Sequence, residues 1–322
     1  MFRKVLLNVA AALVLLIVVM VLVILLRWDR TFDAPLPDIR ASTDSAVIAR
    51  GRYLVYGPAH CAYCHSTVET AAALDRGEQP PLAGGFVFKL PVGTFRTPNL
   101  TPDSATGIGG VSDGVIARML RHGVRRDGRA AVPFMNYQSL SDADLTALVS
   151  FLRSQPPVRQ AVPPHDVNFL GKAVLAFVIK PIGPTATPPP ESPSPGPTVE
   201  RGAYLVSAVG ECAGCHTQRS FVDGSYTGPR LAGGSPMEAD GAPGFVAVAP
   251  NLTPDPKTGR ITGWNEDQFV ARFRQGKVIP QSPMPWGAFA RMTDDDLRAI
   301  YRYLRTVPAV EHETGPSLRR SE

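Results

Sequence analysis

All four cysteines of this chain fall in two copies of one short pattern, Cys-x-x-Cys-His. In this pattern two thiols add to the vinyl groups of a porphyrin and the adjacent histidine binds its iron, which is how c-type haem is attached. A zinc site or a pair of disulfides is the alternative, but neither requires a histidine directly after the second cysteine in both copies. We therefore expect two covalently attached haem c groups on Cys61, Cys64, Cys212 and Cys215, with His65 and His216 as iron ligands.

Composition narrows the class further. With 322 residues, 44% of them apolar, the chain is long enough for more than one domain. The 32 prolines and 29 glycines indicate many turns and loops. The formal charge is only +5, and no dense basic stripe with interleaved aromatic residues occurs, so we expect no nucleic-acid partner.

The N-terminus carries an apolar run, Val5 to Leu26, whose only polar member is Asn8. At about 1.5 Å per residue it spans roughly 33 Å, close to the thickness of a bilayer's hydrocarbon core. A cleaved signal peptide is the alternative, but the run exceeds the usual apolar region and no A-x-A-like cleavage site follows. We expect a retained anchor over residues 1–27 and a tether over residues 28–46.

The rest of the chain repeats itself at a period of about 151 residues, which suits a duplicated domain. The order of every repeated block is preserved. The pairs are 49–55 with 200–206, 82–85 with 231–234, 98–103 with 250–255, 141–145 with 293–297 and 151–153 with 303–305. We therefore expect two homologous haem domains.

Each copy is expected to be a small helical domain. The first helices are predicted near 44–58 and 198–210, and the middle helices over 112–122 and 265–275, where Gly123 and Gly276 suit the C-terminal cap. The last helices are predicted to begin at Ser141 and Thr293, whose hydroxyls suit an N-cap. One apolar stripe on each last helix predicts a core face.

On these residues each copy resembles the class I cytochrome c fold, in which the first and last helices cross beside the haem. In that family a small residue on the first helix lets the last helix approach, and Gly51 and Gly202 match it, opposite Phe151 and Tyr303. The tandem also resembles the cytochrome subunits of membrane-bound alcohol and gluconate dehydrogenases, which share the Asn-Leu-Thr-Pro-Asp block. Those subunits carry three haem domains, whereas this chain carries two after its anchor.

The resemblance implies an all-α fold, with two class I cytochrome c domains in tandem after an N-terminal transmembrane helix. The expected boundaries are 47–155 for the first domain, 156–198 for an apolar segment and proline-rich linker, 199–310 for the second domain and 311–322 for a tail.

The resemblance also implies a methionine as sixth iron ligand, in the loop before each last helix. A soft, uncharged thioether favours Fe(II) and raises the redox potential. Met284 occupies such a loop in the second copy. In the first copy an ungapped alignment places Val132 against Met284, and Met135 three residues later is the candidate. An open or histidine-ligated first iron is the alternative.

In the same family a proline carbonyl accepts the Nδ1–H of the axial histidine and fixes the ring. Pro80 and Pro229, in loops before the Leu-Ala-Gly-Gly blocks, are the residues predicted for this role. Simple turn prolines are the alternative.

Two stretches outside the haem patterns are candidate contact surfaces. The apolar segment from Val167 to Ile182 is too short to cross a bilayer, so it packs between the domains or rests on the membrane or on a partner. An excess of arginine between Arg118 and Arg129 is either a solvated face or a docking patch for a redox partner.

The pattern favours a membrane-anchored dihaem c-type cytochrome. We expect it to carry electrons between a membrane dehydrogenase or quinol-oxidising complex and a terminal acceptor. The family assembles haem c outside the cytoplasm, which implies a single pass through the inner membrane with the haem domains on the periplasmic side. No catalytic constellation competes, so we expect an electron carrier and not an enzyme. The alternative is a dihaem, peroxidase-like enzyme with an open first haem.

Overall fold

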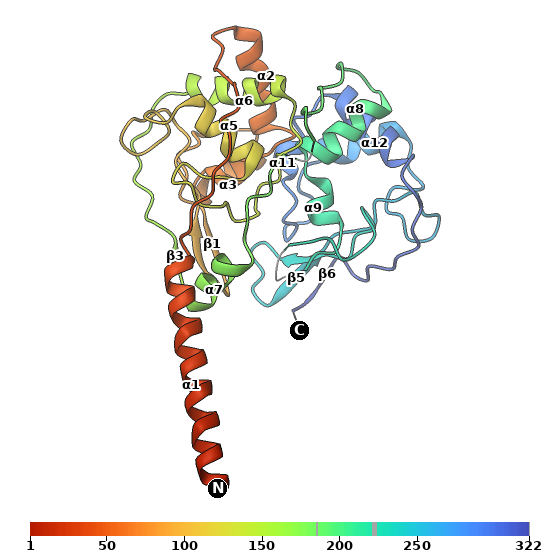
Figure 1. The fold of residues 1–322 in the computed structure, drawn as a ribbon. Coiled ribbons are helices and arrows are strands. Elements are labelled where there is room, and N and C mark those ends of the chain that lie inside the picture. Colours follow the sequence, from red (N-terminus) through yellow and green to blue (C-terminus); the bar gives the residue numbers. More distant parts are fainter. Residues whose placement is uncertain (185, 221–223, 322) are drawn as a thin grey trace.

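The computed structural model describes residues 1–184, 186–220 and 224–321. Two halves stand side by side above a long N-terminal helix, α1 (Phe2–Arg27), which extends away from them (Figure 1). In the described part of the chain, α1 is the one helix long and apolar enough to cross a membrane. Ile24 is its only buried residue, so nearly all its apolar side chains face outward.

Over the described residues the two halves share one order of main elements, although the first half has two additional helices and the second has one. The first half contains α2 (Ser45–Tyr56), α3 (Cys61–His65), α4 (Val68–Asp75), β1 (Val87–Leu90), β2 (Gly93–Arg96), α5 (Asp113–His122), α6 (Asp142–Ser154), β3 (Asp166–Val167) and α7 (Phe169–Phe177). The second contains α8 (Val199–Tyr204), a π-helical turn η1 (Leu205–Val209), α9 (Cys212–His216), β4 (Pro236–Glu238), β5 (Phe245–Val248), α10 (Glu266–Arg274), α11 (Trp286–Phe289), α12 (Asp294–Leu304) and β6 (Leu318–Arg320).

Two short sheets correct the expectation of an all-α fold. Each has three antiparallel strands, in the order β1-β2-β3 in the first half and β4-β5-β6 in the second. The hairpin of β1 and β2 pairs Phe88 with Phe95, and that of β4 and β5 pairs Met237 with Ala247. The strands are two to four residues long, too short for an alternating apolar pattern to reveal them in the sequence.

The first and last helices of each half cross at a glycine, as the resemblance implied. A Cβ on Gly51 would lie 1.9 Å from the carbonyl oxygen of Ala147, and one on Gly202 would lie 1.9 Å from that of Ala299. Any side chain at these positions would separate α2 from α6 or α8 from α12. The glycines therefore set the close approach of the two helices that frame each half.

Hydroxyl caps begin the last helices where the sequence predicted them. Ser141 Oγ accepts the amide of Asp144 at the start of α6, and Thr293 Oγ1 accepts the amide of Asp296 at the start of α12. Gly123, which was predicted to end the middle helix, closes α5 in the left-handed conformation with φ of 65°. Local capping chemistry thus sets these boundaries.

The stretch predicted as a tether packs along the first half. Ile39 is 5% exposed and lies in a small core with Leu145 and Val149 of α6. The amide of Ala41 donates to Asp113 Oδ2 over 2.8 Å. The chain leaving α1 is therefore part of the folded body and ties α1 to it.

The apolar segment after the first half does not pack between the halves. Its helix, α7, lies against the C-terminal end of α1 and against the β1–β2 hairpin (Figure 1). Asn168 Nδ2 donates to the carbonyl oxygen of Pro91 at the tip of that hairpin, over 2.7 Å. The interdomain alternative for this segment is therefore wrong.

A continuous hydrophobic core joins the halves. One cluster of buried side chains contains Leu54 and Leu148 from the first half together with Leu205 and Ile300 from the second. The halves therefore form one packed body, and their relative placement is set by burial of apolar surface.

Candidate metal centres

Each Cys-x-x-Cys-His run forms a single helical turn, α3 in the first half and α9 in the second. The residue before each turn adopts the left-handed conformation, with φ of 39° at His60 and 53° at Glu211. Two cysteines three positions apart on a helical turn lie on the same face. The sequence thus brings together one thiol pair in each half, as attachment to one edge of a porphyrin requires.

Both histidines direct Nδ1 at a proline carbonyl, and these prolines are Pro98 and Pro250. The Nδ1 atom of His65 lies 3.2 Å from the carbonyl oxygen of Pro98, and that of His216 lies 2.9 Å from the carbonyl oxygen of Pro250. This contact orients each ring and leaves Nε2 for a metal.

The prediction of Pro80 and Pro229 for this role is wrong. The carbonyl of Pro80 instead accepts the hydroxyl of Tyr56 over 2.6 Å, and that of Pro229 accepts the amide of Ala232. The loops that contain Pro80 and Pro229 contact the main chain of the histidines. In the first half, the amide of Gly84 donates to the carbonyl of His65 over 2.9 Å. These loops thus position the turn and not the imidazole.

A repeated buried network holds the proline carbonyls in place. In the first half, Asn99 Oδ1 accepts both the amide and the hydroxyl of Thr101, over 2.9 and 2.8 Å. Its Nδ2 donates to the carbonyl of Val158 over 2.8 Å. Asn251, Thr253 and Val310 repeat these bonds in the second half. The duplicated Pro-Asn-Leu-Thr block was therefore the sequence signal for the correct prolines.

A glycine allows each proline carbonyl to come close. Gly84 has φ of 73°, and a Cβ there would lie 2.5 Å from the carbonyl carbon of Pro98. Gly233, with φ of 75°, stands in the same relation to Pro250. The Leu-Ala-Gly-Gly blocks thus contribute a backbone that only glycine tolerates at this contact.

Burial favours the neutral, metal-binding form of both imidazoles. Desolvation lowers the pKa of His65 to about 4, and it lowers the pKa of His216 as well. A neutral imidazole is the form that ligates a metal.

The surroundings of the four thiols favour their neutral form. All four cysteines are free of disulfides. Burial raises the pKa of the Cys61 and Cys212 thiols to about 12 and that of Cys64 to about 11. Over the ranges that the structure describes, no group of three or more His, Cys, Asp or Glu side chains converges as a metal cluster. This donor set suits a haem, which takes two thioethers and one imidazole, better than a zinc ion.

The two methionine loops contain the same backbone turn but carry the methionine at different positions. The amide of Trp286 donates to the carbonyl of Met284 over 2.7 Å, and the amide of Phe134 donates to the carbonyl of Val132 over the same distance. Val132 therefore takes the backbone place of Met284. Met135 lies one residue beyond that turn and, like Met284, is partly buried against the shared core.

The two haem-attachment turns lie close to one another across the junction of the halves. Cys215 is near enough to Cys64 to contribute to the raised pKa of the Cys64 thiol, after the larger effect of burial. Asn136 Nδ2, beside Met135, donates to Glu211 Oε2 over 2.8 Å. The ring of His60 meets that of Phe289 edge-on, with centroids 5.5 Å apart. Residues of each half therefore border the other half's site.

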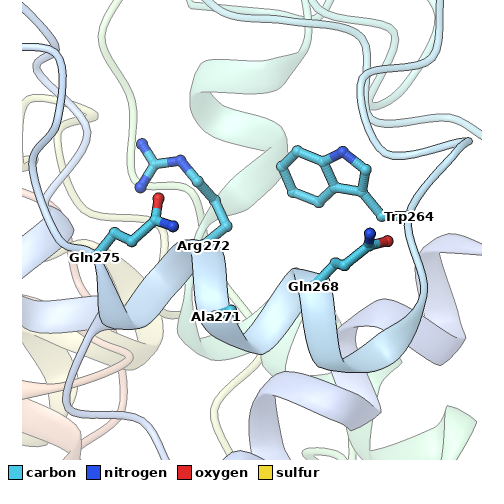
Figure 2. Close-up of a pocket in the computed structure, with 5 residues that line it drawn as sticks. All are labelled: Trp264, Gln268, Ala271, Arg272 and Gln275. Carbon is cyan, nitrogen blue, oxygen red and sulfur yellow. The ribbon is translucent and has the colours of Figure 1, made fainter.

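A shallow pocket follows the outer side of α10, next to the second methionine loop. Figure 2 shows Gln268, Arg272 and Gln275 projecting from α10, with Trp264 coming from the loop before it. The guanidinium carbon of Arg272 lies 3.6 Å from the centroid of the Trp286 ring, two residues after Met284. This places a cation beside the loop that is predicted to supply the sixth ligand.

The arginine cluster of the first half is largely structural. Arg121 is 3% exposed, donates to the carbonyl of Gln138 over 3.0 Å and pairs with Asp142 over 2.6 Å. Arg118 Nη2 donates to the carbonyl of Arg125 over 2.8 Å. These side chains serve the fold, which does not favour the docking-patch interpretation.

Comparison with known proteins agrees with this geometry. The family described as "Cytochrome C oxidase, cbb3-type, subunit III" matches residues 197–304. The cytochrome c subunit of the quinone alcohol dehydrogenase of Gluconobacter oxydans is 33% identical over 83% of this chain and 56% of its own length. The gluconate 2-dehydrogenase cytochrome c subunit of Pantoea cypripedii is 31% identical over 86% of this chain and 62% of its own.

A "Diheme cytochrome c-type" protein of Cereibacter sphaeroides is 30% identical over 78% of this chain and 83% of its own length. These observations define a haem-carrying electron-transfer protein. The chain belongs to the c-type cytochrome family and resembles the cytochrome subunits of quinone alcohol, gluconate and fructose dehydrogenases. It spans little more than half the length of those dehydrogenase subunits.

Proposed function

We propose that the chain is a membrane-anchored dihaem cytochrome c that passes single electrons between a membrane dehydrogenase or quinol-oxidising complex and a terminal acceptor. The observation that carries this proposal is the duplicated donor set. Each half has one helical turn with two thiols and one imidazole, and each imidazole is oriented by a proline carbonyl.

The residues take the following roles in this proposal. Cys61 and Cys64 hold one haem and Cys212 and Cys215 the other, and His65 and His216 are the proximal ligands. Met135 and Met284 supply the sixth ligands. When bound in this way, a haem iron cycles between Fe(III) and Fe(II) and so accepts and donates one electron. The buried histidines and the shared core keep water away from the site and limit its rearrangement.

The proposed domain boundaries follow the repeat, with one haem domain over 47–155 and the other over 199–310. The network of Asn99 extends to Val158, and that of Asn251 extends to Val310. Val310 coincides with the second limit, whereas Val158 lies three residues beyond the first, so the contacts of the first half extend slightly past its proposed limit. Residue 322, at the end of the predicted tail, lies outside the described residues.

We further propose that α1 is retained as a single-pass anchor in the inner membrane and that both halves lie on the periplasmic side. The outward-facing apolar side chains of α1 suit lipid. A contact between α1 and the body supports a helix that stays attached, because Arg27 Nε at the end of α1 donates to the carbonyl of Ala176 over 3.2 Å.

The test is to count the haems and their ligands in the purified full-length protein. We expect the intact mass to exceed the chain by two haems and the pyridine haemochrome absorbance to give two haems per chain. Replacing Cys61 and Cys64 with alanine should remove one haem, and replacing Cys212 and Cys215 should remove the other. A single haem in the unmodified protein would contradict the proposal.

A second candidate function is favoured by one observation, that Val132 occupies the backbone place of Met284. A first iron without a thioether would be open to a small ligand, as a peroxidase-like enzyme requires. The oxidised spectrum separates the two. Methionine ligation at both irons gives far-red bands that Met135→Ala and Met284→Ala each weaken. A high-spin signal that Met135→Ala leaves unchanged would favour the enzyme.

A further inference from the structure

The first half carries an exposed apolar face that electron transfer does not explain. Five large apolar side chains on and around α7 are each between 38% and 56% exposed. We call them the α7 face, and they are Leu90, Phe169, Leu170, Phe177 and Ile182. Scattered exposed apolar residues are ordinary, but a patch of five on neighbouring segments marks a binding surface.

This face lies where α1 leaves the body (Figure 1). Arg27 Nε donates to the carbonyl of Ala176 over 3.2 Å, and Arg30 Nη2 donates to the carbonyl of Ile179 over 3.2 Å. The ammonium of Lys172 lies 5.0 Å from the centroid of the Trp28 ring. Side chains at the end of α1 thus hold α7 directly beside the exit of the apolar helix.

The hairpin of β1 and β2 extends the same face. Gly171 of α7 packs so tightly on the hairpin turn that a Cβ there would lie 2.0 Å from the carbonyl oxygen of Val92. Together with the bond from Asn168 to Pro91, this contact fixes the tip that carries Leu90 next to α7. The face is therefore a rigid part of the first half.

Charge around the face suits a lipid surface. Lys89 and Lys180 are exposed on segments next to α7 and Lys172 lies on α7, while α7 itself contains no acidic residue. The exposed carboxylates of Asp29 and Asp166 on the flanking segments leave lysine in excess. Lysines and tryptophans at the boundary of an apolar surface match lipid headgroups, which are often anionic.

We propose that the α7 face rests on the surface of the bilayer that α1 spans, with its apolar side chains in the interface. This inference rests on the proposed role of α1 as a retained anchor. Continuity with that anchor selects a lipid surface over a protein partner, because a helix held beside the exit of α1 meets lipid first. Two contacts, one spanning and one lying flat, fix the orientation of the haem domains on the membrane.

The experiment measures lipid exposure of spin labels in the full-length protein in lipid nanodiscs. The native cysteines are occupied by haem in the proposed function, so a nitroxide reacts with one introduced thiol. The test sites are Leu170→Cys and Phe169→Cys on the face. Val14→Cys in α1 is the lipid-exposed reference, and Ser45→Cys at the start of α2, at the opposite end of the body, is the water-exposed reference (Figure 1).

We expect the ratio of oxygen to nickel-chelate accessibility to be several-fold higher at Leu170 and Phe169 than at Ser45, and lower than at Val14. Haem absorbance identical to that of the unmodified protein shows that each variant is folded. If the label at Val14 is lipid-exposed while those at both face sites match Ser45, this inference fails and the anchor stands. If Val14 also matches Ser45, the anchor fails and this inference fails with it.

Discussion

The hydroxyl of Tyr53 on α2 donates a hydrogen bond to Asp296 Oδ2 on α12 over 2.6 Å, so the first helix of one half is joined to the last helix of the other. The reverse contact exists as well. The hydroxyl of Tyr204 on α8 donates to Asp144 Oδ2 on α6 over 2.8 Å. Residues at equivalent places in the repeat thus exchange the same bond across the junction.

Each of these aspartates is also paired within its own half. Arg50 Nε lies 2.9 Å from Asp144 Oδ1, and Arg201 Nε lies 2.8 Å from Asp296 Oδ1. The halves therefore meet as the subunits of a two-fold symmetric dimer do, through one self-complementary surface used twice. This arrangement brings the two Cys-x-x-Cys-His turns close together at the same junction.

Removing either tyrosine hydroxyl should loosen this junction. For Tyr53→Phe and Tyr204→Phe we expect the free energy of unfolding to fall by about 1.5–3 kcal/mol each, the usual contribution of a hydrogen bond to a charged group. Denaturant unfolding of the haem-loaded protein measures it. Tyr226→Phe, at a tyrosine that is 50% exposed, should change stability little. Equal midpoints for all three variants would show that these bonds do not hold the halves together.

Adding one methyl group at a helix crossing should be far more damaging. In Gly202→Ala the new Cβ would lie 1.9 Å from a main-chain oxygen, so α8 and α12 must move apart. Overpacking of a core typically costs about 1–3 kcal/mol, and a backbone contact this short belongs at or above the upper end. Gly263→Ala, with open space around it, is the matched control. Thermal unfolding followed by haem absorbance compares the two variants, and equal melting temperatures would contradict the predicted clash.

The features that were predictable from sequence are those with a local chemical signature. The two haem-attachment turns and the hydroxyl caps at Ser141 and Thr293 follow from short patterns. The glycine at each helix crossing was implied by the resemblance to class I cytochromes c. The repeat predicted a first, a middle and a last helix in each half, and the structure has all three in both.

What sequence reasoning missed depends on contacts between distant residues. Pro80 and Pro98 both precede short blocks that recur in the repeat, and the contact of Pro98 with His65 is a long-range one that Gly84 permits. The short strands have no pattern of their own, and β3 joins the hairpin of β1 and β2 from about seventy residues away. The contact of α7 with α1 is likewise long-range. The apolar composition of the segment predicts that it packs against something, but not against which element.

Glu211 should make stability depend on pH near neutrality. Burial raises the pKa of this carboxyl from its ordinary 4.5 to about 7, although its bond from Asn136 opposes the shift. The folded protein therefore holds a proton that the unfolded chain releases. The resulting stability is fully present below about pH 4.5 and is lost as pH rises through about 7.

In Glu211→Gln this loss should disappear, so that the free energy of unfolding between pH 4.5 and 7 becomes flatter than in the unmodified protein. Since one pKa unit corresponds to about 1.4 kcal/mol, the difference across the window should be on the order of 1–3 kcal/mol. Denaturant unfolding at a series of pH values measures it. Glu311→Gln, which removes an exposed carboxylate paired with Lys257, should leave the pH profile unchanged, and the same unchanged profile in Glu211→Gln would contradict the assignment.

Arg272 should raise the redox potential of the second proposed haem. Its guanidinium stacks on Trp286, beside the Met284 loop, and a nearby cation favours the reduced, less positive iron (Figure 2). Counting back from Gly276 and Gly123, the equivalent residue of the first half is the uncharged Met119. We expect Arg272→Met to lower one midpoint potential by tens of mV, because the positive charge that is removed destabilises the oxidised iron more than the reduced one, even at an effective dielectric constant of about 20. Arg272→Lys retains the charge and should keep most of the potential, while the other haem serves as the internal reference in the same spectroelectrochemical titration. Equal shifts in the methionine and lysine variants would mean that packing on Trp286, and not charge, tunes this site.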